Sequence, residues 1–396
     1  MLNREELVNT AILTRLSYFH LNAMVGLYRT LGSATAIMEQ RKNLGSIFPG
    51  LPKRVLADIN EMASMRDRAE EELAWADDHG VKALCLNDDG YPNRMKEAPD
   101  APLMLFYKGT ANLNARHIIN IVGTRQCTRY GEDLIRAFVR DLHAMVPDTI
   151  VVSGLAYGVD IHAHREALAN GMDTVAVLAH GLDTLYPPTH RDDANRMVSQ
   201  GGLITEYMTR TKPDKLNFVR RNRITAGLCD ATILMESARK GGGLITTRIA
   251  KEYNRDVFAF PGPVGAPYSE GCNNLIRGCG AGLITSAEDF VEDMGWENEA
   301  TLEKARSKGI ERSLFPDLTE DEQKNRRLAQ TSQRPATRHD ISEDRHQRRE
   351  PHGTALPAGD ERRGKSLCRR NISLDGMTTR NHCHNFRIII AKKRKI

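Results

Sequence analysis

The residues best equipped for chemistry gather between Lys215 and Arg223. This stretch, Lys-Leu-Asn-Phe-Val-Arg-Arg-Asn-Arg, holds four cations, two amides and one aromatic ring, Phe218. Cations neutralise phosphates, and an aromatic face stacks on a base for about 1 to 3 kcal/mol, so the mixture suits a polynucleotide. A solvated helix start with Phe218 in the hydrophobic core is the alternative.

These cations stand out because the main body of the chain is acidic. The chain has 396 residues and a net charge of +5. Residues 325–396 hold 18 Lys and Arg against 7 Asp and Glu, which leaves residues 1–324 with 38 against 44. Nucleic-acid binding by the body therefore needs a local basic cluster.

Two kinds of hydrophobic pattern divide the body. Residues 1–78 show apolar positions at helical spacing, which predicts a small all-helical domain. Residues 79–296 begin with short extended segments and continue with apolar runs that alternate with amphipathic helices. This alternation predicts an α/β domain with a Rossmann-like, doubly wound and mostly parallel sheet. The expected strands cover 81–86, 103–107, 118–122, 149–152, 174–178, 203–205, 231–235, 256–260 and 282–285.

Glycine-rich loops follow several of these strands. They are Gly123-Thr-Arg125, Ser153-Gly154-Leu-Ala-Tyr-Gly158 and Lys240-Gly-Gly242-Gly243-Leu-Ile-Thr-Thr247. Ligands of open α/β sheets gather at the carboxyl ends of the strands, where glycines let backbone N–H groups approach phosphate. We therefore expect Arg125 to face the same groove as the stretch from Lys215 to Arg223.

Enzyme chemistry has weaker support in the sequence. The first loop lacks the G-x-G-x-x-G fingerprint, and Gly243 is followed by Leu244 instead of the Walker A lysine, which disfavours NAD and ATP. His162 and His164 lie about 200° apart on a helix and would not share a metal, and we expect His164 to be structural. The seven cysteines include no C-x-x-C pair, which indicates neither a zinc site nor a disulfide framework. With the missing fingerprints, we therefore expect no metal and no cofactor.

Five motifs along the chain belong together. They are Ser153-Gly-Leu-Ala-x-Gly158-Val-Asp160-x-x-Ala163-His164, Gly181-Leu-Asp183-x-x-Tyr186-Pro187, Arg221-Asn-Arg-Ile-x-Ala-Gly-Leu228, Gly243-Leu-Ile-Thr246 and Phe260-Pro-Gly262 with Gly271-Cys-Asn273-x-Leu-Ile276.

Together these motifs resemble the DprA/Smf (DNA-processing protein A) family. The resemblance covers about residues 80 to 290, and more loosely the helical N-terminal region, which would be a domain of the SAM or helix-hairpin-helix type. Two loops depart from the family pattern. The chain has Gly123-Thr-Arg125 where the family more often has Gly-Ser-Arg, and Gly241-Gly-Gly-Leu244 where the family has Ser-Gly-Ser-Leu.

The resemblance implies a non-enzymatic protein that binds and protects single-stranded DNA. It also implies a homodimer that helps to load the RecA recombinase, chiefly in natural transformation (competence) and DNA recombination. The sequence has no run of 18 apolar residues and no secretory signal, so we expect a cytoplasmic protein without membrane contact. The residues expected to bind DNA are Arg125, Ser153, Gly154, Lys215, Phe218, Arg221, Asn222, Arg223, Gly242 and Gly243.

The end of the chain carries no such pattern. We expect a linker over 297–324 and a disordered basic tail over 325–396. Codons for Lys324 to Gln330 exist that, read one base further along, give Ile-Val-Ala-Leu-Leu, and the same offset turns residues 359–373 into a plausible helix end and wing. Our hypothesis is that the tail is an out-of-frame winged-helix domain, a domain with which many family members end. An evolved basic arm that contacts phosphates is the alternative.

Two functions from other classes stay open at this point. A nucleotide-processing enzyme of a related Rossmann-like fold would depend on an acid such as Asp183 or Glu236. A scaffold that acts only through protein partners would bind no oligonucleotide. Transformation, recombination and phage defence are three biological settings that would all use the same binding.

Overall fold

The computed structural model describes residues 3–61 and 65–296. The expected linker over 297–324 and the tail over 325–396, with the frameshift hypothesis, lie outside the described residues. Within the described part of the chain, no helix is both long and apolar enough to cross a lipid bilayer. The thiols there are all free, and Cys279 is the exposed one among them.

The N-terminal region is helical, as its periodicity predicts. Asn3 caps the first helix by accepting a hydrogen bond from the Glu5 N–H, and Gly32 ends it with φ +83°. The residues before Gly32 form one long helix that kinks at His20, whose φ and ψ are not helical. The helices are α1 (Arg4–Leu31), α2 (Ala34–Glu39), α3 (Leu44–Ile47), α4 (Lys53–Glu61) and α5 (Arg66–Asp78).

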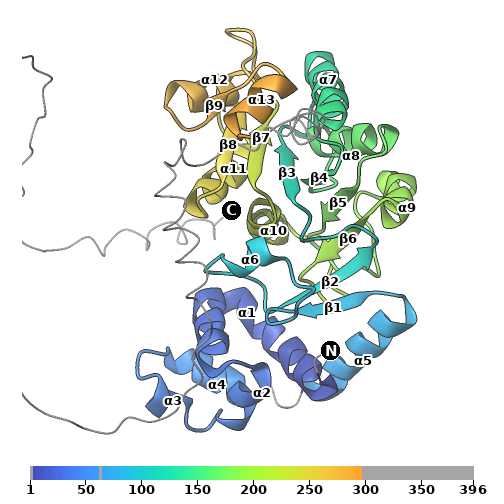
Figure 1. Ribbon diagram of the computed structural model, residues 1–396. Coiled ribbons are helices and arrows are strands. Elements are labelled where there is room, and N and C mark those ends of the chain that lie inside the picture. The colour runs from blue at the N-terminus through green and yellow to red at the C-terminus, as the bar shows by residue number, and fades with distance from the viewer. Residues whose placement is uncertain (1–2, 62–64, 297–396) are drawn as a thin grey trace, which may run out of the picture. The chain divides into compact units, whose positions relative to one another are not determined.

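A nine-stranded sheet forms the centre of residues 82–296, in the order β1-β2-β6-β5-β4-β3-β7-β8-β9 (Figure 1). The strands from β3 onward pair in parallel, and β1 and β2 add an antiparallel edge next to β6. The doubly wound, mostly parallel fold is therefore confirmed. The strands are β1 (Lys82–Cys85), β2 (Met104–Gly109), β3 (His117–Val122), β4 (Thr149–Ser153), β5 (Thr174–Val177), β6 (Gly201–Thr205), β7 (Ala231–Leu234), β8 (Asp256–Ala259) and β9 (Gly282–Leu283).

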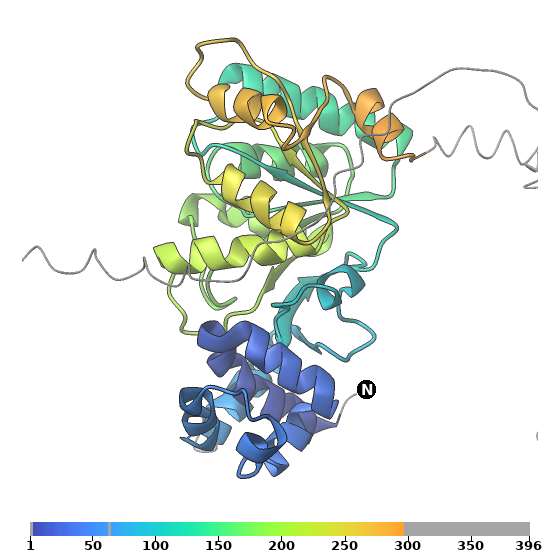
Figure 2. The same cartoon turned by 90° about the vertical axis from the view of Figure 1, so that its left-hand side faces the viewer.

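Helices cover both faces of this sheet (Figures 1 and 2). Alternate side chains of the central strands enter two cores: Ile118 packs with Ile224 of α10, whereas Ile119 packs with Phe138 of α7. The order of the strands reverses between β3 and β7, which makes their carboxyl ends the switch point of the sheet. The remaining helices are α6 (Asn93–Lys96), α7 (Arg129–Met145), α8 (Val159–Ala169), η2 (Pro188–His190), α9 (Arg191–Ser199), α10 (Lys215–Gly227), α11 (Gly243–Glu252), α12 (Glu270–Arg277) and α13 (Ala287–Asp293).

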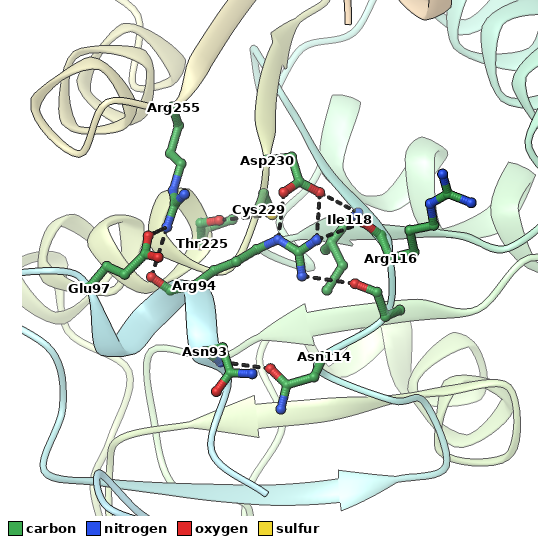
Figure 3. A network of polar contacts seen from close by, with 11 residues as sticks. Asn93, Arg94, Glu97, Asn114, Arg116, Ile118, Thr225, Cys229, Asp230 and Arg255 are labelled. Atoms are coloured by element: carbon green, nitrogen blue, oxygen red, sulfur yellow. Dashed lines mark hydrogen bonds and ion pairs between the residues drawn. The ribbon is translucent and has the colours of Figure 1, made fainter. Parts of the chain in front are cut away.

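An ion-pair network ties the segment around α6 to the amino ends of β3 and β7 (Figure 3). The Arg94 guanidinium donates to both carboxylate oxygens of Asp230, at 2.6 and 2.8 Å, and to the backbone oxygen of Ala115 at 2.9 Å. Asp230 also accepts from the Ile118 N–H at 3.0 Å. The two charged side chains are 16% and 25% exposed, so each needs the other to offset its loss of water.

We predict that Arg94→Ala lowers the free energy of unfolding by about 3 kcal/mol, because it leaves Asp230 half-buried without its cation. The measurement is urea unfolding followed by circular dichroism. The control is Arg4→Ala, which breaks the exposed pair with Asp77 and should cost less than about 1 kcal/mol. If both variants lost the same free energy of unfolding, the conclusion that Arg94 and Asp230 offset each other's burial would be wrong.

Candidate nucleic-acid interface

Two loops meet at the carboxyl ends of β3 and β4. The Val159 N–H donates to the Thr124 backbone oxygen at 3.1 Å, and Gly158 lies directly against this backbone. A Cβ atom on Gly158 would lie 2.3 Å from that oxygen, and its φ of +77° also favours glycine. The contact holds Arg125, the next residue of the β3–α7 loop, at a defined place on this edge of the sheet.

Arg125 meets the start of α10 there. Its guanidinium carbon lies 5.4 Å from the centroid of the Phe218 ring, within the range of a cation–π contact. The Phe218 ring is half-buried and also packs against Tyr186, with 5.6 Å between the centroids. Asp214 caps α10 by accepting from the Leu216 N–H at 2.7 Å, and Lys215 is exposed in the first turn. Arg125, Lys215 and Phe218 thus lie on neighbouring elements at one edge of the sheet.

Arg221 adds a buried cation beside them. Its side chain is 5% exposed and its guanidinium lies against Gly154, where a Cβ atom would be 1.7 Å from Nη1. Gly154 is therefore the residue that lets the guanidinium reach the end of β4. Nε of Arg221 has no hydrogen-bond partner among the described residues, and no described carboxylate lies within 4.0 Å of the group.

Arg221 is a buried cation on which two charged neighbours, Asp160 and Arg125, act in opposite directions. Burial lowers the pKa of Arg221, and Asp160 opposes the shift, while the positive charge of Arg125 adds to it. Burial raises the pKa of the Asp160 carboxyl, which Arg221 opposes. Burial and Arg221 together lower the pKa of His164 to about 3, so this imidazole is neutral near pH 7. An anion placed next to Arg221 would offset the cost of burying its charge.

Arg223 lies elsewhere. Its guanidinium is 5% exposed, forms an ion pair with Glu206 and donates to the Asp100 backbone oxygen at 2.7 Å. The reason is helical phase: Arg223 is five positions beyond Phe218, or about 140° around α10. The expectation that Arg223 faces the same groove as Phe218 is not what the structure shows, so we leave it out of the interface.

The other expected residues take different places. Asn222 is half-buried and lies about 40° around α10 from Phe218. The Ser153 hydroxyl is buried and donates to the Ile121 backbone oxygen at 2.7 Å, which joins β4 to β3. Gly243 is buried, and a Cβ atom on it would lie 2.7 Å from a Leu234 methyl group, whereas Gly242 is exposed at the start of α11. Ser153 and Gly243 thus support the edge of the sheet, and Asn222 and Gly242 are accessible.

His164 has the structural place expected of it. Its ring is fully buried, and Nδ1 lies 2.7 Å from the Thr174 hydroxyl. His162 points elsewhere on α8 and lies 3.3 Å from a Glu132 oxygen. Over residues 3–61 and 65–296, no group of three or more His, Cys, Asp or Glu side chains is arranged to hold a metal.

Two tyrosines near the interface were not identified from the sequence. Tyr186 is 40% exposed beside Phe218, and Tyr157 is 45% exposed in the β4–α8 loop. Both belong to the glycine-containing motifs that led to the family resemblance. Large apolar groups are normally buried, whereas strand-to-helix loops lie at the surface. An aromatic residue in such a loop is therefore the signal that could have identified Tyr157 and Tyr186.

Comparisons with known proteins agree with this fold. Residues 82–295 match the family described as DNA recombination-mediator protein A. The chain is 39% identical to DNA processing protein DprA of Streptococcus pneumoniae over 60% of this chain and 86% of that protein. It is 36% identical to protein Smf of Escherichia coli over 58% of this chain and 61% of that protein.

A solved structure supports the same assignment. The X-ray structure of DprA from Streptococcus pneumoniae matches with a TM-score of 0.57 and 31% identity, and covers 72% of this chain and 93% of that one. The sequence match and the fold thus point to one group of proteins. The chain belongs to the DNA recombination-mediator protein A family, which includes the DprA and Smf proteins.

Proposed function

We propose that this protein binds single-stranded DNA at the carboxyl edge of β3 and β4. The observation that carries the proposal is that Arg125 lies over the Phe218 ring, with Arg221 close enough to Arg125 to interact electrostatically and Lys215 one turn before Phe218 on α10. None of these three cations has a described carboxylate within 4.0 Å, although the chain up to residue 324 is acidic overall. A site with unpaired cations and an aromatic ring suits phosphates and stacked bases together.

Each group has its own part in the proposed complex. Arg125 and Lys215 are exposed and would contact phosphates, with the N-terminus of α11 at Gly242 as a further donor site. Arg221 would supply charge from beneath the surface, where it is screened less by water. A base would stack on the Phe218 ring, which the Arg125 guanidinium covers. The base would either displace this guanidinium or lie beside it. Since stacking does not depend on base identity, we expect tolerance of sequence.

The finer parts of the function are proposals that rest on the family. We propose that the protein acts without catalytic turnover in the cytoplasm, protects single-stranded DNA, and helps to load RecA as a homodimer. Several relatives bear names that refer to DNA processing. Residues 1–78 and 79–296 would then serve as an N-terminal helical domain and a DNA-binding domain.

The carboxylates of Glu236 and Asp183 disfavour the alternative of a nucleotide-processing enzyme, because both are already hydrogen-bonded within the protein. In nucleotide-binding Rossmann folds, phosphate lies at the N-terminus of the helix that follows the first strand. Here Glu236 occupies that place at the start of α7: it accepts from the Thr128 N–H at 2.8 Å and the Thr128 hydroxyl at 2.7 Å. Asp183 accepts from the Arg210 N–H at 2.8 Å. Both acids that the enzyme alternative named are engaged in holding loops.

The proposal is tested by fluorescence anisotropy with a labelled oligo-dT. We expect saturable binding whose affinity falls with salt, with a log–log slope of about −0.7 for each phosphate contacted, and about −2 for three contacts. The sign follows from counterion release when cations neutralise phosphates. Absence of an anisotropy change with any oligonucleotide would favour the scaffold alternative, and turnover of a mononucleotide would favour the enzyme.

A further inference from the structure

Arg125 also lines a cleft that the proposed contacts at Phe218 do not use. Its volume is about 420 Å³, within the range of sites that bind small molecules. The β3–α7 loop, the β4–α8 loop, α8 and η2 form its walls. Its functional side chains are Arg125, Tyr157, His162, Arg165, Thr189 and His190.

Tyr157 gives this cleft an aromatic wall that is already positioned. The ring is 45% exposed, yet it packs edge-on against His190, with 5.0 Å between the centroids. Its hydroxyl lies 3.3 Å from the Thr189 hydroxyl. His190 is itself buried, with Nδ1 2.9 Å from the Leu155 backbone oxygen. Stacking a ligand on Tyr157 would therefore cost little side-chain entropy, because the tyrosine ring is already held in place before the ligand binds.

The charges of the cleft leave Arg125 as its uncompensated cation among the described residues. Nε2 of His162 lies 3.3 Å from a Glu132 oxygen, and Arg165 forms an ion pair of 2.9 Å with Asp193. Arg125 has no such partner there and also lies over Phe218. The same guanidinium thus lies over the Phe218 ring and also lines the cleft that Tyr157 lines.

We infer that the cleft binds a second base of the DNA strand held at Phe218, stacked on Tyr157. The backbone phosphate between the two bases contacts Arg125. This inference rests on the proposed function, since it needs a strand at Phe218. A base fits better than an isolated anion because the cleft offers an aromatic face and hydroxyl groups but one unpaired cation.

The test compares wild type, Tyr157→Ala and Tyr157→Phe in anisotropy titrations with oligo-dT of decreasing length. Tyr157→Ala should weaken binding of long oligonucleotides about tenfold, the loss expected for one stacked base. It should leave the affinity for the shortest oligonucleotide that wild type binds unchanged, because that ligand fills the Phe218 site alone. Tyr157→Phe keeps the ring and should match wild type at every length.

Three outcomes separate this inference from the proposed function. If wild type binds and Tyr157→Ala binds equally well at all lengths, the inference is wrong and the proposed function stands. If Tyr157→Ala loses the same factor at every length, Tyr157 acts by positioning Arg125, and the inference is again wrong. If wild type binds no oligonucleotide, the proposed function itself fails. Thermal melting accompanies each variant, and Tyr157→Leu, which keeps bulk without an aromatic face, replaces an alanine variant that melts early.

Discussion

Replacing Arg125 and Lys215 together by alanine is expected to weaken single-stranded DNA binding about 100-fold. Each side chain is exposed and has no ion pair with a described carboxylate, so its loss removes a phosphate contact and breaks no internal pair. Hydrogen bonds to charged groups contribute about 1.5 to 3 kcal/mol, and a tenfold change in affinity is about 1.4 kcal/mol. A loss of about 100-fold therefore corresponds to the low end of two such contacts.

The salt dependence gives this prediction a second measurement. Two lost phosphate contacts should reduce the log–log slope by about 1.4, because each contact to a single strand contributes about 0.7. The matched control is the double variant Arg54→Ala and Lys82→Ala, which also removes two exposed positive charges without a described ion pair, one on α4 and one on β1. If both double variants lose affinity equally, net charge and not the interface would govern binding.

Arg223→Ala is expected to lower the free energy of unfolding by about 3 to 5 kcal/mol. The variant removes the ion pair between Arg223 and the buried Glu206, in a place where burial already raises the pKa of that carboxyl and Arg223 opposes the rise. Urea unfolding at pH 7 measures the loss. The folded fraction should keep wild-type affinity for oligo-dT, because Arg223 faces away from Phe218.

The control for this prediction is another arginine–glutamate pair. Arg248 and Glu252 on α11 are 71% and 64% exposed, and Arg248→Ala should cost less than about 1 kcal/mol. Should Arg223→Ala leave stability nearly unchanged but abolish DNA binding, Arg223 would be a DNA ligand after all, and the separation of roles along α10 would be wrong.

The position of each cation around helix α10 decides whether it is exposed, buried or ion-paired. From the sequence, the cations between Lys215 and Arg223 looked equivalent, because they lie within nine positions of one another. In the structure, Lys215 is exposed, Arg221 lies under the surface against Gly154, and Arg223 pairs with Glu206 on the opposite side of the helix. Writing the stretch on a 3.6-residue period would have separated Arg223 from Phe218.

The glycines behave in a similar way. The loops were chosen because glycines let a backbone approach phosphate. Gly154 instead makes room for the Arg221 guanidinium, and Gly158 makes room for the backbone of Thr124 and Arg125. Their contribution to the proposed site is therefore to bring side chains from other loops together. A motif alone does not distinguish space for a ligand from space for a neighbouring residue.

By itself, the sequence determined the class of fold, the places of the strands and the edge where a ligand would gather. Strand and helix periods are local properties, and the carboxyl ends of parallel strands share one edge whatever the details of packing. It also identified Arg125, Lys215 and Phe218 as candidates. The tertiary structure decided which cations are accessible, that Tyr157 and Tyr186 flank them, and that Glu236 fills the phosphate position at α7. Those properties depend on burial and on contacts between residues far apart in the chain, which no local spacing contains.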